Sequence, residues 1–237
     1  MPPASDAGPS FNAVIVAGGR SSRLGGQPKA LLRASGATLL SGTLAAASGA
    51  VACAVAGPAG LAGLTAAAAE ASRSPILLVR EDPPFAGPAA GVAAGMAALS
   101  RLDGAEGRVS PDWTLVLACD MPFIAGAVER LLAAARVEEE AEQDAAPYSL
   151  LAVDGTGHMQ PLAGLYRTGA LTEAIAAAAG TGGLQNLAMR TLLARVQWKD
   201  VAVPAHSTAD IDTWEDASRW SVAAPAAEDQ QGPAASS

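Results

Sequence analysis

The feature that most constrains this chain is a short apolar run that passes directly into a glycine-rich loop. Residues 11–16 (FNAVIV) are almost wholly apolar, and Gly18, Gly19, Gly25 and Gly26 follow within the next ten positions. Glycines let backbone N–H groups approach a ligand closely, and successive N–H groups form a concavity that suits phosphate oxygens. The spacing matches neither the G-x-G-x-x-G dinucleotide fingerprint nor the G-x-x-x-x-G-K-[ST] phosphate loop. We therefore predict a strand followed by a phosphate-binding loop of another type.

Two cations in and after this loop, Arg23 and Lys29, are candidates to neutralise the charge of a triphosphate. Only two of the 15 basic residues in the chain are lysines, and Lys29 is one of them. A compact, mobile ammonium suits a phosphate that shifts during a reaction, whereas a guanidinium would impose its rigid planar fork. The position of Lys29 therefore points to phosphate chemistry rather than to a solvated surface.

Apolar runs alternate with Ala/Leu-rich helical stretches along most of the chain. We expect strands at 11–16, 51–56, 76–79, 113–118, 148–153, 161–166 and 196–203, and helices at 38–49, 61–71, 88–100, 124–135, 169–179, 184–194 and 213–220. Thr38, Thr168 and Thr213 are the expected N-caps. The early strands are continuously apolar, as strands are when helices cover both faces of a parallel sheet. The pattern predicts one Rossmann-like, doubly wound α/β domain with a mostly parallel sheet, whose ligands bind at the carboxyl ends of the strands.

Length and composition set the domain organisation. A chain of 237 residues suits one sizeable core, so we expect a single domain at 11–221 between disordered ends at 1–10 and 222–237. The chain contains no apolar run long enough to predict a membrane span. Its net charge is −8 and it has no basic stripe, which argues against nucleic acid as a partner. Cys53 and Cys119 lie in apolar runs, which favours a reduced, cytoplasmic protein, although a disulfide stays open.

A second candidate site residue, Asp120, follows the expected strand at 113–118. A carboxylate at the carboxyl end of a strand faces the ligand crevice, where it can hold a hard divalent cation against phosphate oxygens. The structural alternative is a turn aspartate before Pro122. A third segment holds Asp82 and then Gly87-Pro88, a typical helix start that leaves N–H groups free.

These segments together resemble a known family. The pattern A-G-G-x-x-x-R-[LM]-G-G-x-x-K at 17–29 resembles the signature loop of nucleotidyltransferases of the molybdenum-cofactor guanylyltransferase type. Four further segments resemble motifs of that family in the same order, namely Asp82 with Gly87-Pro88-Ala-Ala-Gly, Asp120-Met-Pro, Gln160-Pro161-Leu-Ala-Gly-Leu-Tyr, and Asp210-Ile-Asp212-Thr-Trp-Glu-Asp. The chain departs from the family at Ala89, where leucine is usual, and at Trp214, where proline is usual.

The resemblance implies a nucleotidyltransferase domain that moves GMP from GTP to molybdopterin, with Mg²⁺ and with release of pyrophosphate. It implies catalytic roles for Lys29, Arg23 and Asp120, and metal binding by Asp120 and Asp212. It places the nucleotide at Val16, Ala17, Gly18, Gly19, Lys29, Asp82, Gly87 and Asp120, and the acceptor beside Gln160 and Pro161. The implied partners are GTP and molybdopterin or the molybdenum cofactor, with transient contact with other proteins of the cofactor pathway or with molybdoenzymes.

Two other functions stay open at this point. Pro28, directly before Lys29, is reminiscent of related cytidylyltransferases, so a molybdopterin cytidylyltransferase or another small-molecule NTP transferase is the alternative. A non-catalytic cofactor carrier is the alternative of another class, although a carrier needs neither Lys29 nor Asp120. A phosphate nucleophile is already ionised near neutral pH, so the absence of a histidine or cysteine base from the motifs agrees with phosphate transfer.

Overall fold

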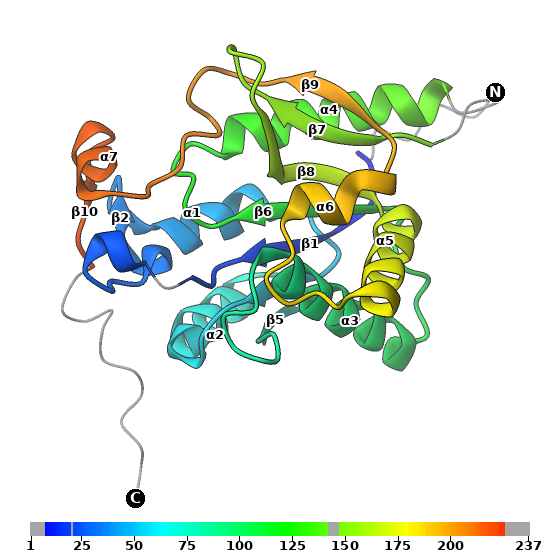
Figure 1. Cartoon of the computed structure of the whole chain (residues 1–237), viewed down its shortest axis with the longest axis horizontal. Helices are drawn as coiled ribbons and strands as arrows, with labels where there is room; N and C mark the ends of the chain where they lie inside the picture. The colour runs from blue at the N-terminus through cyan, green and yellow to red at the C-terminus, as the bar shows by residue number, and fades with distance from the viewer. Residues whose placement is uncertain (1–7, 20, 142–146, 226–237) are drawn as a thin grey trace, which may run out of the picture.

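The computed structural model describes residues 8–19, 21–141 and 147–225, and its centre is one mixed sheet of seven strands (Figure 1). The strands are β1 (Phe11–Val16), β4 (Cys53–Ala56), β5 (Ile76–Val79), β6 (Trp113–Ala118), β7 (Ser149–Val153), β8 (Met159–Arg167) and β9 (Trp198–Ala202). Their spatial order is β5-β4-β1-β6-β8-β7-β9, and β8 alone runs antiparallel to its neighbours. The predicted doubly wound, mostly parallel α/β fold is confirmed.

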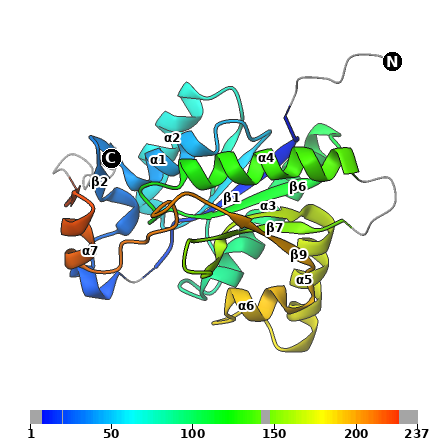
Figure 2. The same cartoon turned by 90° about the horizontal axis from the view of Figure 1, so that it is seen from above.

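Helices cover both faces of this sheet. They are α1 (Leu39–Ala46), α2 (Ala62–Ala71), α3 (Pro88–Glu106), α4 (Ala125–Ala141), α5 (Thr168–Thr181), α6 (Met189–Leu192) and α7 (Trp214–Arg219), with 3-10 turns at Ser22–Leu24, Lys29–Leu31, Ala59–Leu61 and Leu193–Arg195. Figure 2 shows α1, α2 and α4 on one side of the sheet and α3, α5 and α6 on the other. None of the helices in the described ranges is long and apolar enough to cross a membrane.

The alternation of side chains along β1 explains why two cores form. Phe11, Ala13 and Ile15 are buried in the core under α1, α2 and α4, whereas Val14 packs into the core under α3, α5 and α6. Successive side chains of a strand point to opposite faces, so an entirely apolar strand fits only between two helical layers. This burial fixes β1 in the centre of the sheet, and with it the direction in which the glycine-rich loop leaves.

A second, small sheet joins the segment that follows the glycine-rich loop to residues 222–223, and the sequence analysis did not foresee it. Its strands are β2 (Arg33–Ala34), β3 (Ala37–Thr38) and β10 (Val222–Ala223), in the order β10-β2-β3. Val222, the first residue of the segment expected to be disordered, is buried there, so the ordered domain continues past residue 221. Residues 8–10 and 223–225 of the expected disordered ends are also described, and Pro9 among them is buried, whereas residues 1–7 and 226–237 lie outside the described residues.

The predicted helix caps have mixed outcomes. The Thr38 and Thr213 side chains accept the backbone N–H groups of Ser41 and Asp216, so both N-cap predictions are confirmed. The Thr168 prediction is wrong, because Thr168 is the first residue of α5 and Arg167 precedes it as the N-cap. The Thr168 hydroxyl instead donates to the carbonyl oxygen of Pro111, and this bond ties α5 to the loop before β6.

Gly95 lets α3 approach β1 closely. A Cβ atom at Gly95 would lie 2.6 Å from Cγ1 of Val14, which is closer than real Cβ atoms come to any neighbour. Val14 is fully buried and β-branched, so its side chain has little freedom to move aside. The missing side chain at Gly95 therefore sets the distance between α3 and the sheet.

We expect Gly95→Ala to lower the free energy of unfolding by about 1–3 kcal/mol, because an added methyl group would overpack a rigid core. Gly104→Ala is the matched control in the same helix, since a Cβ at Gly104 would meet nothing within 4 Å. The control is expected to raise stability by up to about 1 kcal/mol through helix propensity. Urea denaturation measures the free energy of unfolding of both variants. Equal changes at the two positions would contradict the close approach of α3 to β1.

Candidate active site

The predicted phosphate-binding loop leaves β1 at the carboxyl edge of the sheet. Ala17 donates its backbone N–H to the carbonyl oxygen of Ala56, which holds the start of the loop beside the end of β4. Gly25 and Gly26 adopt positive φ angles of 66° and 80°, and Gly26 donates to the carbonyl oxygen of Ser21. Glycine adopts such angles at no steric cost, so this pair closes the loop tightly and returns the chain toward the sheet.

Lys29 is positioned by a 3-10 turn that begins directly after Pro28. This turn, Lys29–Leu31, buries Ala30 and Leu31 in the core. The Lys29 side chain stays partly accessible, with 21% of its surface exposed. The burial of its two successors therefore anchors Lys29 at the edge of the sheet.

Asp120 reaches the same edge from β6. Cys119 donates its backbone N–H to the carbonyl oxygen of Val16, which extends the pairing of β6 with β1 beyond the last strand residue. The carbonyl oxygen of Asp120 accepts the backbone N–H of Ile211 at 3.0 Å. Ile211 is fully buried against Leu24 and other residues near the small sheet, so this bond is part of a packed junction. It brings the next residue, Asp212, beside Asp120.

Lys29, Asp120 and Asp212 form one side-chain cluster, which we call the Lys29 cluster. The Nζ atom of Lys29 donates to Oδ2 of Asp120 at 2.7 Å and also to Oδ1 of Asp212. Arg23 lies at the rim, where its guanidinium pairs with Oδ2 of Asp212 at 3.7 Å and remains 73% exposed. Four of the residues expected to bind phosphate or metal are thus brought together from three separate parts of the chain.

The electrostatics of the cluster follow from partial burial and close carboxylates. Burial disfavours the charged form of Lys29, but the nearby Asp120 and Asp212 carboxylates outweigh it and raise the pKa of Lys29 above its usual value of 10.5. Lys29 therefore stays protonated at neutral pH and cannot serve as a general base. Loss of solvent, followed by repulsion from Asp120 and Asp212, raises the pKa of Asp210 above its ordinary 3.8.

The donor set of the cluster fits a divalent cation such as Mg²⁺. Because Asp120 and Asp212 both bond one ammonium group, their carboxylates lie within reach of a single cation. Within the described ranges, no three His, Cys, Asp or Glu side chains form a metal site by themselves. Mg²⁺ is commonly held by one or two carboxylates and completes its shell with water and substrate phosphates. A metal here would therefore bind together with a nucleotide.

The third predicted segment lies at the same edge but outside the cluster. Gly87 is the N-cap of α3 with a φ of 95°, and Pro88 is the first helical residue, so the predicted helix start is confirmed. The loop before it is held by Glu81, whose carboxylate accepts the backbone N–H of Phe85 at 2.9 Å. The structure does not bring Asp82 into the Lys29 cluster; it is exposed in this loop.

The reversed direction of β8 explains why Gln160 and Pro161 lie at the same edge of the sheet as the Lys29 cluster. Because β8 runs antiparallel to β6, its first residues lie at the edge where β6 ends. The Tyr166 hydroxyl donates to the carbonyl oxygen of Pro161 at 2.6 Å, and Gly164 leaves the space that the Tyr166 ring fills. The start of β8 is thus fixed at the carboxyl edge of the parallel strands.

Two residues near the site were not singled out from the sequence. Asp210, whose pKa responds to both carboxylates of the cluster, belongs to a quoted motif in which only Asp212 was chosen. Asn186 donates its backbone N–H to the carbonyl oxygen of Ala86 at 2.6 Å, directly before α3, and has a φ of 57°. Asparagine tolerates this conformation, and the glycines at 180, 182 and 183 were the available signal for a structured loop.

The Thr213 capping box fixes the backbone beside Asp212. The Asp216 carboxylate accepts the backbone N–H groups of Asp212 and Thr213, at 3.2 and 2.8 Å, while the Thr213 hydroxyl oxygen accepts the N–H of Asp216. We expect Thr213→Ala to lower stability by about 1 kcal/mol, the usual loss for an N-cap. Chemical denaturation measures the loss, with Ser218→Ala in the exposed face of α7 as the control. An unchanged midpoint in Thr213→Ala would contradict the role of the cap.

The same capping box predicts an acid titration. Hydrogen bonds from the Thr213 side chain and then from its backbone lower the pKa of Asp216 below its usual 3.8. The carboxylate therefore stabilises the fold above pH 3.8, and this contribution is lost as the pH falls through the lower pKa of the folded state. An NMR titration of the Asp216 carboxyl carbon is expected to show a midpoint below 3.8 that moves back toward 3.8 in Thr213→Ala. Identical midpoints in the two proteins would argue against the hydroxyl bond.

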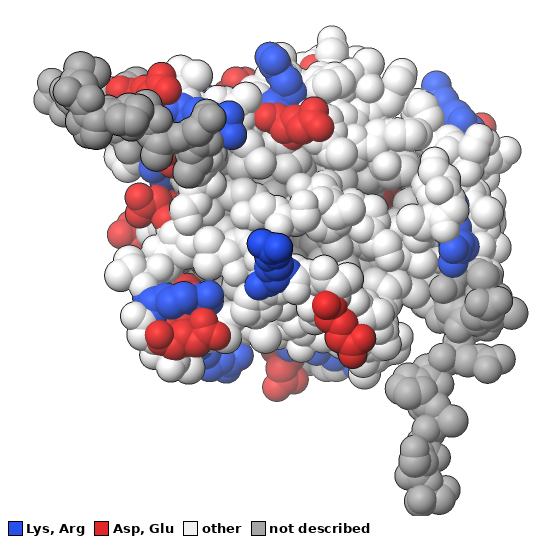
Figure 3. All heavy atoms as spheres, turned by 180° about the vertical axis from the view of Figure 1, so that it is seen from behind, with Lys and Arg blue, Asp and Glu red and all other residues white. Residues whose placement is uncertain are grey.

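Figure 3 shows how charge is distributed over one face of the molecule. On this face Lys and Arg side chains lie singly or next to Asp and Glu, and they do not gather into a stripe. The cations that could meet a phosphate at the carboxyl edge are instead those of the loop and the cluster. Cys53 and Cys119 are both free and buried, and burial raises the pKa of the Cys53 thiol to about 12. Neither thiol is therefore suited to act as a nucleophile.

Several solved structures share this fold. The homologue of Mycobacterium tuberculosis Rv0371c from Mycobacterium sp. strain JC1 is 24% identical, with a TM-score of 0.60 over 88% of this chain and 93% of that one. Molybdopterin-guanine dinucleotide biosynthesis protein A from Archaeoglobus fulgidus is 19% identical (TM-score 0.57; 88% and 96% covered). The 2-C-methyl-D-erythritol 4-phosphate cytidylyltransferase from Thermus thermophilus is 22% identical (0.57; 89% and 97%). At these identities the likeness shows the fold alone.

The family assignment rests on the sequence itself. No curated protein matches the chain. Residues 13–210 match the model of the MobA-like NTP transferase domain, a span that includes the glycine-rich loop, Lys29 and Asp120. This span is well over half of the chain, and it agrees with the predicted resemblance and with the fold of the structural neighbours. The chain belongs to the family of MobA-like NTP transferase domains, which are nucleotidyltransferases.

Proposed function

We propose that the protein transfers GMP from GTP to molybdopterin and releases pyrophosphate. The observation that carries this proposal is the Lys29 cluster, which stands at the carboxyl end of β6 beside the glycine-rich loop of β1. One ammonium and two carboxylates in contact are the groups that a triphosphate and a divalent cation require. The resemblance of the motifs to the guanylyltransferase branch supplies the choice of nucleotide and acceptor.

The reaction follows from the groups present. An oxygen of the acceptor phosphate attacks the α-phosphorus of the nucleotide, a new P–O bond forms, and the bond to the β-phosphate oxygen breaks to release pyrophosphate. The protonated Lys29 and the rim residue Arg23 stabilise negative charge on the phosphates, while the backbone of Gly18 and Gly19 cradles them. Asp120 and Asp212 would hold Mg²⁺, which supplies further charge neutralisation.

A general base is not required, because the acceptor phosphate is already ionised near neutral pH. Neither histidine takes part in the Lys29 cluster. His206 lies against Trp220, with ring centroids 4.7 Å apart, and His158 is exposed in the turn between β7 and β8. Catalysis would therefore consist of positioning and charge stabilisation, as is usual in phosphoryl and nucleotidyl transfer.

One sequence feature favours the second candidate, a cytidylyltransferase. Pro28 precedes Lys29 and fixes the backbone before the 3-10 turn at a φ of −62°, as in the motif form associated with cytidylyl transfer. The nucleobase would be recognised by groups outside the Lys29 cluster. The cluster itself is therefore equally compatible with GTP and CTP.

Pyrophosphate release from each of the four NTPs, in the presence of Mg²⁺ and purified molybdopterin, separates the candidates. Release with GTP supports the proposal, and release with CTP instead supports the cytidylyltransferase. Tight nucleotide binding without release from any NTP would support the carrier. Omission of molybdopterin is the control, because pyrophosphate that forms without an acceptor reports hydrolysis rather than transfer.

A further inference from the structure

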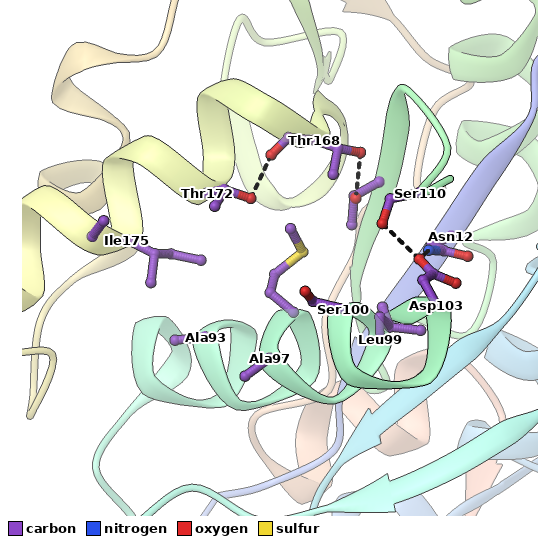
Figure 4. A pocket seen from close by; sticks show the side chains of 13 residues that line it. Asn12, Ala93, Ala97, Leu99, Ser100, Asp103, Ser110, Thr168, Thr172 and Ile175 are labelled. Atoms are coloured by element: carbon purple, nitrogen blue, oxygen red, sulfur yellow. Dashed lines mark hydrogen bonds between the residues drawn. The ribbon is translucent and has the colours of Figure 1, made fainter. Parts of the chain in front are cut away.

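A cavity of about 300 Å³ lies between α3 and α5, far from the Lys29 cluster (Figure 4). We call it the α3–α5 cavity. Asn12 and Thr114 are part of its wall, and they are register partners near the amino-terminal ends of β1 and β6. Asp120 lies six residues beyond Thr114, which corresponds to roughly 20 Å along a strand. The cavity and the candidate active site therefore lie at opposite ends of the same two strands.

Most of the wall is apolar. Met96 and Leu99 line the cavity from α3 and Ile175 from α5, and alanines at 93, 97 and 176 leave the space between the two helices open. The volume lies at the lower end of the range for small-molecule sites, which are usually apolar with a few placed polar groups. The cavity is thus suited to a compact molecule with an apolar body.

The hydroxyl groups of the wall have already used their hydrogens. Ser110 donates to Oδ2 of Asp103 at 2.7 Å, and Thr172 donates to the carbonyl oxygen of Thr168 at 2.8 Å. Thr168 donates to the carbonyl oxygen of Pro111, so in its 2.9 Å contact with Thr114 the Thr114 hydroxyl must be the donor. Apart from Ser100 at the exposed rim, these hydroxyls can offer a ligand only acceptor lone pairs.

Two further side chains of the wall, the Asn12 amide and the Asp103 carboxylate, also carry acceptor oxygens. Nδ2 of Asn12 donates to Oδ2 of Asp103 at 3.3 Å, and this contact sets the orientation of the amide because a carboxylate can only accept. Oδ1 of Asn12 is buried and has no hydrogen-bond partner among the described residues. Arg108 pairs with Asp103 at 2.8 Å, but neither it nor any other Arg or Lys of the described chain lines the cavity.

We propose that the α3–α5 cavity binds a second small molecule, one with a compact apolar body and an amine or other N–H donor. The apolar wall accommodates the body, and Oδ1 of Asn12, unpartnered among the described residues, accepts from the donor together with the Thr114 and Thr168 hydroxyl oxygens. A phosphate-bearing molecule is unsuited to this site, because the wall offers acceptor oxygens and no Arg or Lys side chain of the described part of the chain lines it. The site therefore differs from the nucleotide site in ligand chemistry as well as in position, and it does not depend on the proposed function.

A matched pair of probes tests the donor requirement on the full chain. 2-Phenylethylamine carries the aromatic body with an ammonium donor, and 3-phenylpropionate carries the same ring with a carboxylate. NMR titration of the backbone amides is expected to show saturable binding of the amine, with shifts around Thr114 and Thr172, and at least tenfold weaker binding of the carboxylate. Equal binding of both probes would mean that the cavity binds apolar rings without regard to the donor, and no saturable binding of the amine at millimolar concentration would mean a water-filled cavity only. Either result would overturn the proposal.

Variants that fill the cavity test its location. Ala176→Leu from α5 and Ala97→Leu from α3 each place a larger side chain in the wall, and leucine suits both helices. Each is expected to weaken binding of 2-phenylethylamine at least tenfold. Ala179→Leu, at an exposed position of α5 that does not line the cavity, is the control and is expected to change the affinity less than twofold. Unchanged affinity in both filling variants would place the amine elsewhere and overturn the proposal.

Discussion

Lys29→Ala is expected to lower kcat/KM for the nucleotide by at least ~100-fold, which corresponds to about 3 kcal/mol of lost transition-state stabilisation. The ammonium is held between Asp120 and Asp212 and stays protonated at neutral pH, so it supplies a fixed positive charge where phosphate charge develops. Pyrophosphate release under single-turnover conditions measures the effect on chemistry, and the circular dichroism spectrum reports whether the variant is folded.

Lys199→Ala provides a matched control, because Lys199 is the only other lysine of the chain. It lies on β9, pairs with Glu138 at 2.8 Å, and takes no part in the Lys29 cluster. Its removal is expected to change kcat/KM less than twofold. Equal kinetics of a folded Lys29→Ala variant and the Lys199→Ala control would exclude Lys29 from the reaction.

Asp120→Asn is expected to lower kcat by ~1000-fold or more while the affinity for the nucleotide changes less than about tenfold. The substitution keeps the shape of the side chain but removes the charge that would hold Mg²⁺ against the phosphates. Calorimetric titration with the nucleotide and Mg²⁺ measures binding, and pyrophosphate release measures turnover. We expect Asp212→Asn to have a smaller effect, since Asp212 is 47% exposed whereas Asp120 is 19% exposed.

Asp200→Asn, on the exposed edge strand β9, controls for the general loss of one negative charge. Its kcat is expected to equal that of the unaltered protein. If Asp120→Asn turned over normally with Mg²⁺ in the same assay, the carboxylate would have no role in metal binding. A parallel loss of binding and turnover would instead show that Asp120 contributes equally to the ground state and the transition state.

The parts of the fold that were predictable are those with a long, uniform pattern. The bounds of β1, β5 and β6 agree residue for residue with the expected strands, because a continuously apolar run between polar turns has few other interpretations. Helix starts at Thr38, Gly87 and Thr213 were also predictable, since each follows from the chemistry of a capping residue or a proline. The predictions of helix ends were less accurate. For example, α3 continues to Glu106, well past the expected end at residue 100.

Other features depend on contacts that no local pattern encodes. The two-residue strands of the small sheet are too short to show a period, and the pairing of β2 with β10 joins residues almost 190 positions apart. The reversed direction of β8 did have a signal, because Asp154-Gly-Thr-Gly157 is typical of a hairpin turn between β7 and β8. The resemblance of the motifs already paired Asp120 with Asp212 as metal ligands, but the direct contact of Lys29 with both carboxylates required the three-dimensional structure.

The small sheet also has a consequence for the order in which the protein can become active. A chain made from its amino terminus completes β1, the glycine-rich loop, Lys29 and Asp120 long before residues 211–223 exist. Residues 211–223 supply Asp212 and β10, and they pack against Leu24 and Leu32 from the first part of the domain. A growing chain therefore carries most of the sheet without a complete Lys29 cluster. If Asp212 holds the metal as proposed, nucleotidyl transfer requires the segment 211–223 to be in place, and proteolysis that removes this segment is expected to abolish turnover.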